Sequence, residues 1–200
     1  MHHHDHKNID NVQQVSKKRL GITIFLNFLI TVVEIIGGIV SGSLSLISDA
    51  LHNFSDGIAV ILSYFAVKLN EKPKNEKYTF GYKRAEILTA VFNASVLIGI
   101  SIYLFIEAID RLSNPSNIDS GLMIWVASIG LVANIAGTLL LKKDASHSLN
   151  IKSAYLHLLS DAISSAGVIL GGFAIYFYDI LWIDPLLTIL ISAYIIKESY

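Results

Sequence analysis

Residues 121–141 read GLMIWVASIGLVANIAGTLLL and contain no Asp, Glu, Lys or Arg. A helix needs about 20 predominantly apolar residues to cross the roughly 30 Å hydrocarbon core of a bilayer. A helix also pairs its backbone N–H and C=O groups internally, as a water-free environment requires. The stretch therefore predicts a transmembrane helix rather than a segment of a soluble domain.

Five further apolar stretches of comparable length flank this one. The chain of 200 residues is 53% hydrophobic and only 16% charged, whereas soluble domains carry about 25% charged residues. We therefore predict an all-α membrane protein with six transmembrane helices, the other five at 20–40, 44–67, 85–109, 153–177 and 180–196. The first stretch is too long for a signal-peptide core, so we expect it to be retained.

The basic residues predict the orientation of these helices. Of the 15 Lys and Arg residues, all except Arg111 fall in segments on one side of the predicted spans. Short loops rich in Lys and Arg remain cytoplasmic, so both termini are predicted to be cytoplasmic. Residues 1–19 then form a cytoplasmic, histidine-containing N-terminal segment, and residues 20–200 form the transmembrane domain.

Composition also excludes several classes of function. A net charge of −1 gives no reason to expect a nucleic-acid partner. The absence of cysteine excludes disulfides, thiolate metal sites and thiol nucleophiles.

A charged residue marks the start of the last apolar stretch. Asp184 precedes Pro185, the order typical of a helix N-cap followed by the first helical residue. We favour a capping role alone for Asp184. The sixth helix would then begin a few residues later than hydropathy suggests, and it would be short.

A short polar motif, L-H-x-x-S-D, occurs twice within the apolar stretches, at residues 51–56 and 156–161. Ionisable residues are costly inside a membrane and are expected to face a partner or a water-filled path. In each copy the His and the Asp are four residues apart, which places them on one face of a helix. The His and the Asp of each pair can therefore bind one ion together.

Two imidazoles and two carboxylates form the nitrogen and oxygen ligand set of a tetrahedral zinc site. The two carboxylates would also cancel the charge of a divalent cation in a low-dielectric environment. Cobalt, nickel, manganese and cadmium can use the same ligands, and a structural role in which each His only bonds to its neighbours is the alternative. We predict a metal site formed by His52, Asp56, His157 and Asp161.

Further polar residues are candidates for supporting roles. Asp49 lies three residues before His52 and is predicted to orient an imidazole. An N-terminal cluster is a candidate for capturing metal on the cytoplasmic side, with an added purification tag as the alternative; it comprises His2, His3, His4 and His6.

Three segments together carry a family resemblance: SLSLISDALH at 43–52 followed by Asp56, YTFGYKRAE at 78–86, and SLNIKSAYLH at 148–157 followed by Asp161. They resemble the cation diffusion facilitator family, and in particular its bacterial zinc, cobalt and cadmium resistance branch. The resemblance implies a six-helix, homodimeric exporter in the bacterial cytoplasmic membrane. It also implies that the four predicted ligands form the transport site.

The resemblance extends to the reaction and to the domain organisation. It implies a secondary-active antiporter and not an enzyme. In this antiporter, alternating access exchanges Zn²⁺, or alternatively Cd²⁺ or Co²⁺, for protons. The alternatives are a proton-coupled exporter of organic cations and an intramembrane metallohydrolase, although the H-E-x-x-H signature of many such hydrolases is absent. Most family members continue into a cytosolic metal-binding domain beyond the position of Tyr200, so we expect that domain to be absent from this chain.

Overall fold

The computed structural model describes residues 4–70, 83–142, 145–146 and 149–199. These residues form helices and connecting turns without any strand, which confirms the all-α prediction. The six helices are α1 (His4–Ser41), α2 (Leu44–Asn70), α3 (Lys83–Ser113), α4 (Ser120–Leu141), α5 (Leu149–Tyr178) and α6 (Ile183–Ser199).

Four of these helices are long and apolar enough to cross a membrane. The qualifying segments of the described chain are Gly21–Ser41, Ala90–Ser113, Ser120–Leu141 and Ile151–Tyr178. The other two helices are α2, whose sequence includes Asp49, His52 and Asp56, and α6, which has 17 residues. Six membrane crossings therefore remain a prediction, whereas four apolar spans are a property of the structure.

Two helices differ from the predicted stretches at their N-terminal ends. Helix α1 begins at His4, well before the apolar stretch, because the polar residues that precede Gly21 include neither Pro nor Gly to interrupt a helix. Helix α6 begins at Ile183 and is the shortest of the six, as expected.

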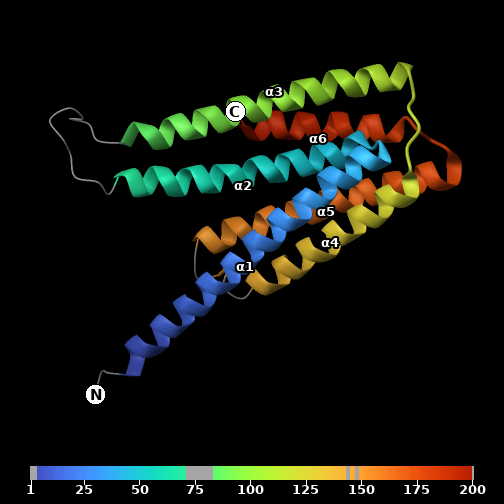
Figure 1. Ribbon diagram of the computed structural model, residues 1–200. Helices are drawn as coiled ribbons and strands as arrows, with labels where there is room; N and C mark the ends of the chain where they lie inside the picture. The colour runs from blue at the N-terminus through green and yellow to red at the C-terminus, as the bar shows by residue number, and fades with distance from the viewer. Residues whose placement is uncertain (1–3, 71–82, 143–144, 147–148, 200) are drawn as a thin grey trace.

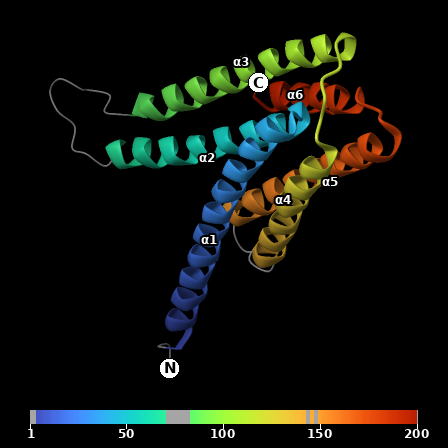
Figure 2. The same cartoon turned by 45° about the vertical axis from the view of Figure 1, so that its right-hand side comes forward.

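The helices form two groups that are inclined to each other, as Figures 1 and 2 show. Helices α1, α4 and α5 form one group, and α2, α3 and α6 form the other. Contacts of α1 with α2, of α5 with α6 and of α2 with α5 join the groups. The two L-H-x-x-S-D motifs lie on α2 and α5, one in each group.

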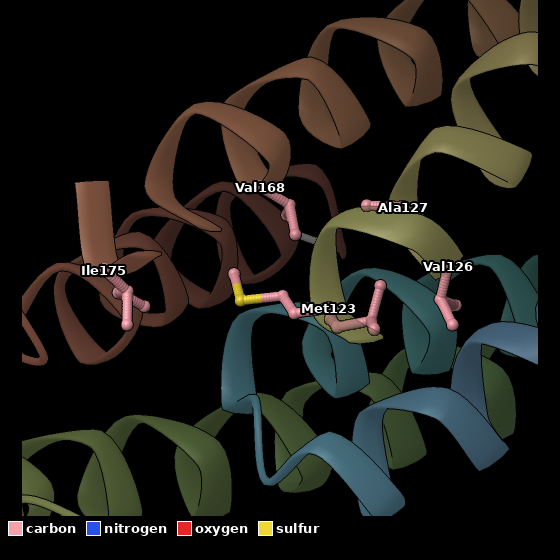
Figure 3. Close-up of a cluster of buried hydrophobic side chains, with 6 residues drawn as sticks. Met123, Val126, Ala127, Val168 and Ile175 are labelled. Carbon is pink, nitrogen blue, oxygen red and sulfur yellow. The ribbon is translucent and has the colours of Figure 1, made fainter. Parts of the chain in front are cut away.

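Polar side chains are buried in this fold, and many large apolar side chains are exposed. Glu34 and Asn134 are 0% and 1% exposed, whereas Trp125 and Leu170 are 73% and 70% exposed. An apolar core nevertheless packs α2 against α4 and α5 (Figure 3); it comprises Leu46, Met123, Val126, Ala127, Val168 and Ile175. An apolar exterior is suited to lipid, because hydrocarbon offers no hydrogen-bond partners.

The N-terminus of α2 is capped by a residue from α6. The Asp184 carboxylate accepts hydrogen bonds from the hydroxyls of Ser43 and Ser45, at 2.7 and 2.6 Å, and from the backbone N–H groups of Leu44 and Ser45, at 2.8 and 3.1 Å. The prediction that Asp184 caps its own helix is wrong, because α6 already begins at Ile183. Its carboxylate satisfies the free donors of a neighbouring helix instead.

Removing this carboxylate should destabilise the protein. The Asp184→Ala variant leaves two buried hydroxyls and two backbone N–H groups without their acceptor, so we expect a loss of about 3 kcal/mol of stability. The midpoint of thermal unfolding in detergent measures the loss. The control is Asp119→Ala, which removes the exposed cap of α4, where one side-chain bond at 2.9 Å is lost. The control should cost about 1 kcal/mol, and equal effects would contradict the role of Asp184.

Candidate metal centre

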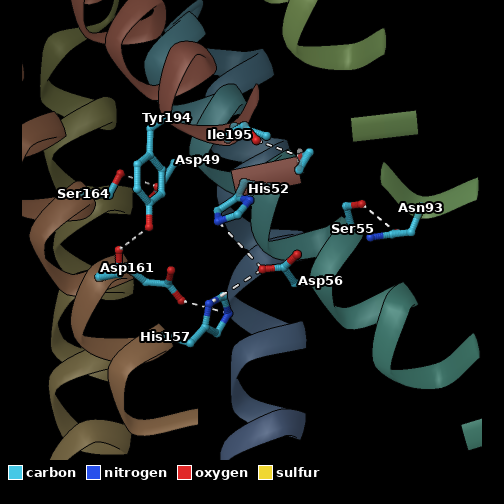
Figure 4. Close-up of polar contacts among 12 residues, drawn as sticks. Asp49, His52, Ser55, Asp56, Asn93, His157, Asp161, Ser164, Tyr194 and Ile195 are labelled. Carbon is cyan, nitrogen blue, oxygen red and sulfur yellow. Dashed lines mark hydrogen bonds and ion pairs between the residues drawn. The ribbon is translucent and has the colours of Figure 1, made fainter. Parts of the chain in front are cut away.

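The four predicted ligands come together where α2 meets α5 (Figure 4). On α2, His52 Nε2 lies 3.8 Å from Asp56 Oδ2, and on α5, His157 Nε2 lies 3.4 Å from Asp161 Oδ2. Between the helices, His157 Nδ1 lies 3.7 Å from Asp56 Oδ2. Two motifs that are about 100 residues apart in the chain thus form one cluster of alternating imidazoles and carboxylates.

The spacing of these atoms is close to that of a tetrahedral zinc site. Bonds of 2.0–2.1 Å to an ion at the centre of a tetrahedron place the ligand atoms about 3.3 Å apart. The His157–Asp161 pair already has this separation, and the His52–Asp56 pair exceeds it by about 0.5 Å, which side-chain rotation can remove.

Three of the four residues form the compact part of the cluster. His52, His157 and Asp161 each offer one ligand atom within 4.8 Å of the others. Asp56 and Asp161 approach different nitrogens of the His157 ring. Because an imidazole directs only one nitrogen at a given ion, Asp56 or His157 must rotate before all four can bind together. The Asp56 side chain is 32% exposed and has more room for this than Asp161, which is 3% exposed.

Asp49 is buried one turn before His52, but it bonds to a different residue. Its Oδ1 accepts a hydrogen bond of 2.5 Å from Ser164 on α5. The Nδ1 atom of His52 has no hydrogen-bond partner among the described residues. Asp49 therefore links α2 to α5 beside the cluster, and its predicted role in orienting an imidazole stays a prediction.

Sequence reasoning missed Tyr194, which reaches the cluster from α6. Its ring lies edge-on to the His52 ring, with centroids 6.4 Å apart, and its hydroxyl is 3.4 Å from that of Ser160. A single tyrosine in a short apolar helix carries no signal that would distinguish it from a packing residue. Ser55, next to Asp56, instead donates to Asn93 Oδ1 on α3 at 3.0 Å.

The N-terminal histidines contribute nothing to this geometry. His2 and His3 lie outside the described residues, and only the helical backbone of His4 and His6 is described. Their proposed role in metal capture remains a prediction.

Comparison with known proteins identifies the family. Residues 20–200 match the family described as "Cation efflux transmembrane domain". The chain belongs to the cation diffusion facilitator family. This confirms the resemblance seen in the three sequence segments and makes the chain a multi-pass integral membrane protein.

Curated relatives agree with this assignment. The chain is 41% identical over 187 residues to the "Cadmium, cobalt and zinc/H(+)-K(+) antiporter" of Bacillus subtilis. This match covers 92% of the present chain and 60% of the relative. It is 37% identical over 199 residues to the "Metal cation efflux system protein CzcD" of Cupriavidus metallidurans, covering 100% of this chain and 61% of that protein. It is 32% identical over 200 residues to the "Zinc transporter ZitB" of Escherichia coli, covering 100% and 64%.

These relatives are bacterial transporters rather than enzymes, which supports the predicted bacterial cytoplasmic membrane. Their names refer to metal ions and do not favour the organic-cation alternative. The chain spans about three fifths of the length of these relatives.

The geometry predicts an order of importance among the four ligands. Zinc affinity should fall most for His52→Ala, His157→Ala and Asp161→Asn, by more than the roughly 10–100-fold typical of residues that only orient a ligand. Asp56→Asn should have the smallest effect of the four, because Asp56 lies outside the compact group. Calorimetric titration of the purified protein with zinc measures these affinities.

The matched control is Ser55→Ala, which changes the residue beside Asp56 but removes only a contact with α3. Its zinc affinity should equal that of the unmodified protein. A His157 variant with unchanged affinity would contradict the proposed centre.

Proposed function

We propose that this protein exports divalent metal cations from the cytoplasm in exchange for protons, with zinc as the preferred ion. The transport site comprises His52, Asp56, His157 and Asp161. The observation that carries the proposal is the meeting of two His–Asp pairs, from α2 and α5, with the His and Asp atoms of each pair 3.8 and 3.4 Å apart. Membership of the cation efflux family supports the same conclusion.

The chemistry of the ligands supports exchange between metal and protons. Histidine and carboxylate bind a metal only when deprotonated, so protons compete with the ion for the same atoms. Imidazole changes its charge near neutral pH, which allows a modest proton gradient to shift the competition. Metal would load from the cytoplasm, and protons from the opposite side would displace it.

The arrangement of the helices supports alternating access. Helix α2 belongs to one group of three helices and α5 to the other, so the proposed site lies at the junction between two bodies (Figure 1). Rocking of one body against the other around a central site is a common way for secondary transporters to open alternately to the two sides. The contacts that Tyr194 makes with His52 and Ser160 place α6 beside the same junction.

The choice of zinc rests on its ligands and on the relatives. Zinc accepts nitrogen and oxygen in a tetrahedral set, and cadmium and cobalt can use the same donors. The names of the relatives include these three ions. We further propose that the chain crosses the membrane six times with both termini cytoplasmic, which the distribution of Lys and Arg supports. The family resemblance is the basis for proposing that it acts as a homodimer.

Transport by the reconstituted protein tests the proposal. In proteoliposomes whose interior is more acidic than the medium, zinc added outside should accumulate inside as protons leave. Collapse of the pH gradient with a protonophore should stop the accumulation. His52→Ala and Asp161→Asn should lower the rate at least about tenfold, because each removes a ligand and Asp161→Asn also removes half of the negative charge that balances the ion. A zinc-sensitive dye inside the vesicles records the rate.

The matched control is Asp110→Asn, which removes an exposed carboxylate that accepts a hydrogen bond from Asn114 at 3.2 Å, outside the proposed site. It should transport zinc at the rate of the unmodified protein. If His52→Ala or Asp161→Asn transports zinc at the rate of the unmodified protein, the proposed site is wrong. If the rate of zinc entry does not depend on the pH gradient, proton coupling is wrong.

A further inference from the structure

Glu34 is a buried acid that the proposed transport site does not use. It lies on α1 and is 0% exposed. Its carboxylate is packed against the backbone of α4, where a Cβ atom placed on Gly130 would overlap Glu34 Oε1. The absence of a side chain at Gly130 is therefore what makes room for this carboxylate between the two helices.

The hydrogen-bonding groups around this position are unused. Neither oxygen of Glu34 accepts a hydrogen bond of normal geometry among the described residues, although the side-chain amide of Asn53 on α2 approaches the carboxylate. Asn134, one turn beyond Gly130 on α4, is 1% exposed, and both polar atoms of its side chain likewise have no partner within the described part of the chain. Buried polar groups are normally paired, so these two side chains at one helix interface are available to bind a proton or water.

The charges that act on Glu34 are all negative. Asp49 on α2 and Asp161 on α5 interact with it electrostatically. Helix α4 contributes no charge, because residues 120–141 include no Asp, Glu, Lys, Arg or His. The apolar stretches that form this part of the molecule contain no Lys or Arg either. An ionised Glu34 would thus face two acids without a fixed positive charge, in surroundings that disfavour ions.

We propose that Glu34 is a second cation site of the protein, separate from the four metal ligands, and that the cation it binds is a proton. Burial and two neighbouring acids favour the neutral form of Glu34 while the metal ligands are unoccupied. The bases of this region, His52 and His157, act on Asp49 and Asp161. A divalent cation bound beside Asp161 removes much of this negative potential. Glu34 then releases its proton to water, and it takes up a proton again when the metal leaves.

This inference rests on the proposed exchange of metal for protons and assigns part of that exchange to a named residue. The coupling requires no contact between Glu34 and the metal, because it acts through the charges of Asp49 and Asp161. Release of one proton from Glu34 would add to the protons displaced from the ligands themselves. The number of protons exchanged per ion would therefore exceed what the ligands alone supply.

The test is the Glu34→Gln variant of the full chain, which keeps the shape of the side chain and cannot ionise. Zinc alone is added to the protein in weakly buffered detergent solution, and a pH-indicator dye measures the protons released. We expect zinc to bind and about one proton fewer to be released per ion than in the unmodified protein. The control Glu107→Gln removes an acid that is paired with Arg111 and should release the unmodified number.

Infrared difference spectroscopy gives a second readout. Addition of zinc to the unmodified protein should remove the carbonyl band of a protonated carboxylic acid, and Glu34→Gln should lack this change. If the Gln variant does not fold, Glu34→Asp serves instead, and it should shift the frequency of the band. Equal proton release from Glu34→Gln and the unmodified protein, or a band unaffected by either substitution, would overturn the inference.

These outcomes are distinguishable from a failure of the proposed function. If the unmodified protein neither binds zinc nor releases protons on its addition, the metal–proton exchange itself is wrong. If it does both and the Glu34 variants behave in the same way, only the assignment to Glu34 is wrong.

Discussion

The interior of this protein places carboxylates in an apolar layer that has no fixed positive charge to balance them. Glu34, Asp49 and Asp161 are almost completely buried, and the apolar stretches contain neither Lys nor Arg. Charge in such surroundings is strongly disfavoured unless it is compensated. A metal ion or protons can supply the compensation, and both can be exchanged. The proposed transport cycle is then the exchange of one compensating cation for another at the junction of α2 and α5.

Two buried acids show how their partners decide their roles. Asp184 accepts hydrogen bonds from two hydroxyls and two backbone N–H groups, so its negative charge is stabilised permanently and holds α6 against the start of α2. Glu34 is equally buried, but among the described residues neither of its oxygens accepts a hydrogen bond of normal geometry, and the amide of Asn53 only approaches it. Asp184 is suited to a structural role because its charge is stabilised by fixed hydrogen bonds and no bound cation has to be released. The second, as we propose, is suited to binding a proton that can be released.

The proposed ligands, and their meeting at one place, could be predicted from sequence because their signal is local. A His and an Asp four residues apart share a helix face wherever the helix lies, and the repetition of the motif identified the two helices that carry them. The partner of Asp184 is about 140 residues away, and Tyr194 approaches His52 only through the packing of α6. No local pattern encodes either contact. The positions of Asp56 and Asp161 at different nitrogens of one imidazole likewise depend on rotamers, which spacing does not determine.

Helix α1 extends well beyond the length that a bilayer requires. With a rise of 1.5 Å per residue, its 38 residues span about 57 Å, against a hydrocarbon core of roughly 30 Å. The apolar part begins at Gly21, so the first turn, with His4 and His6, stands about 25 Å away as the tip of a helical stalk. A metal ion held at that tip could not pass directly to the membrane site. The ion would have to dissociate and diffuse, so this helical extension would raise the local concentration of metal and would not transfer the ion directly to the proposed site.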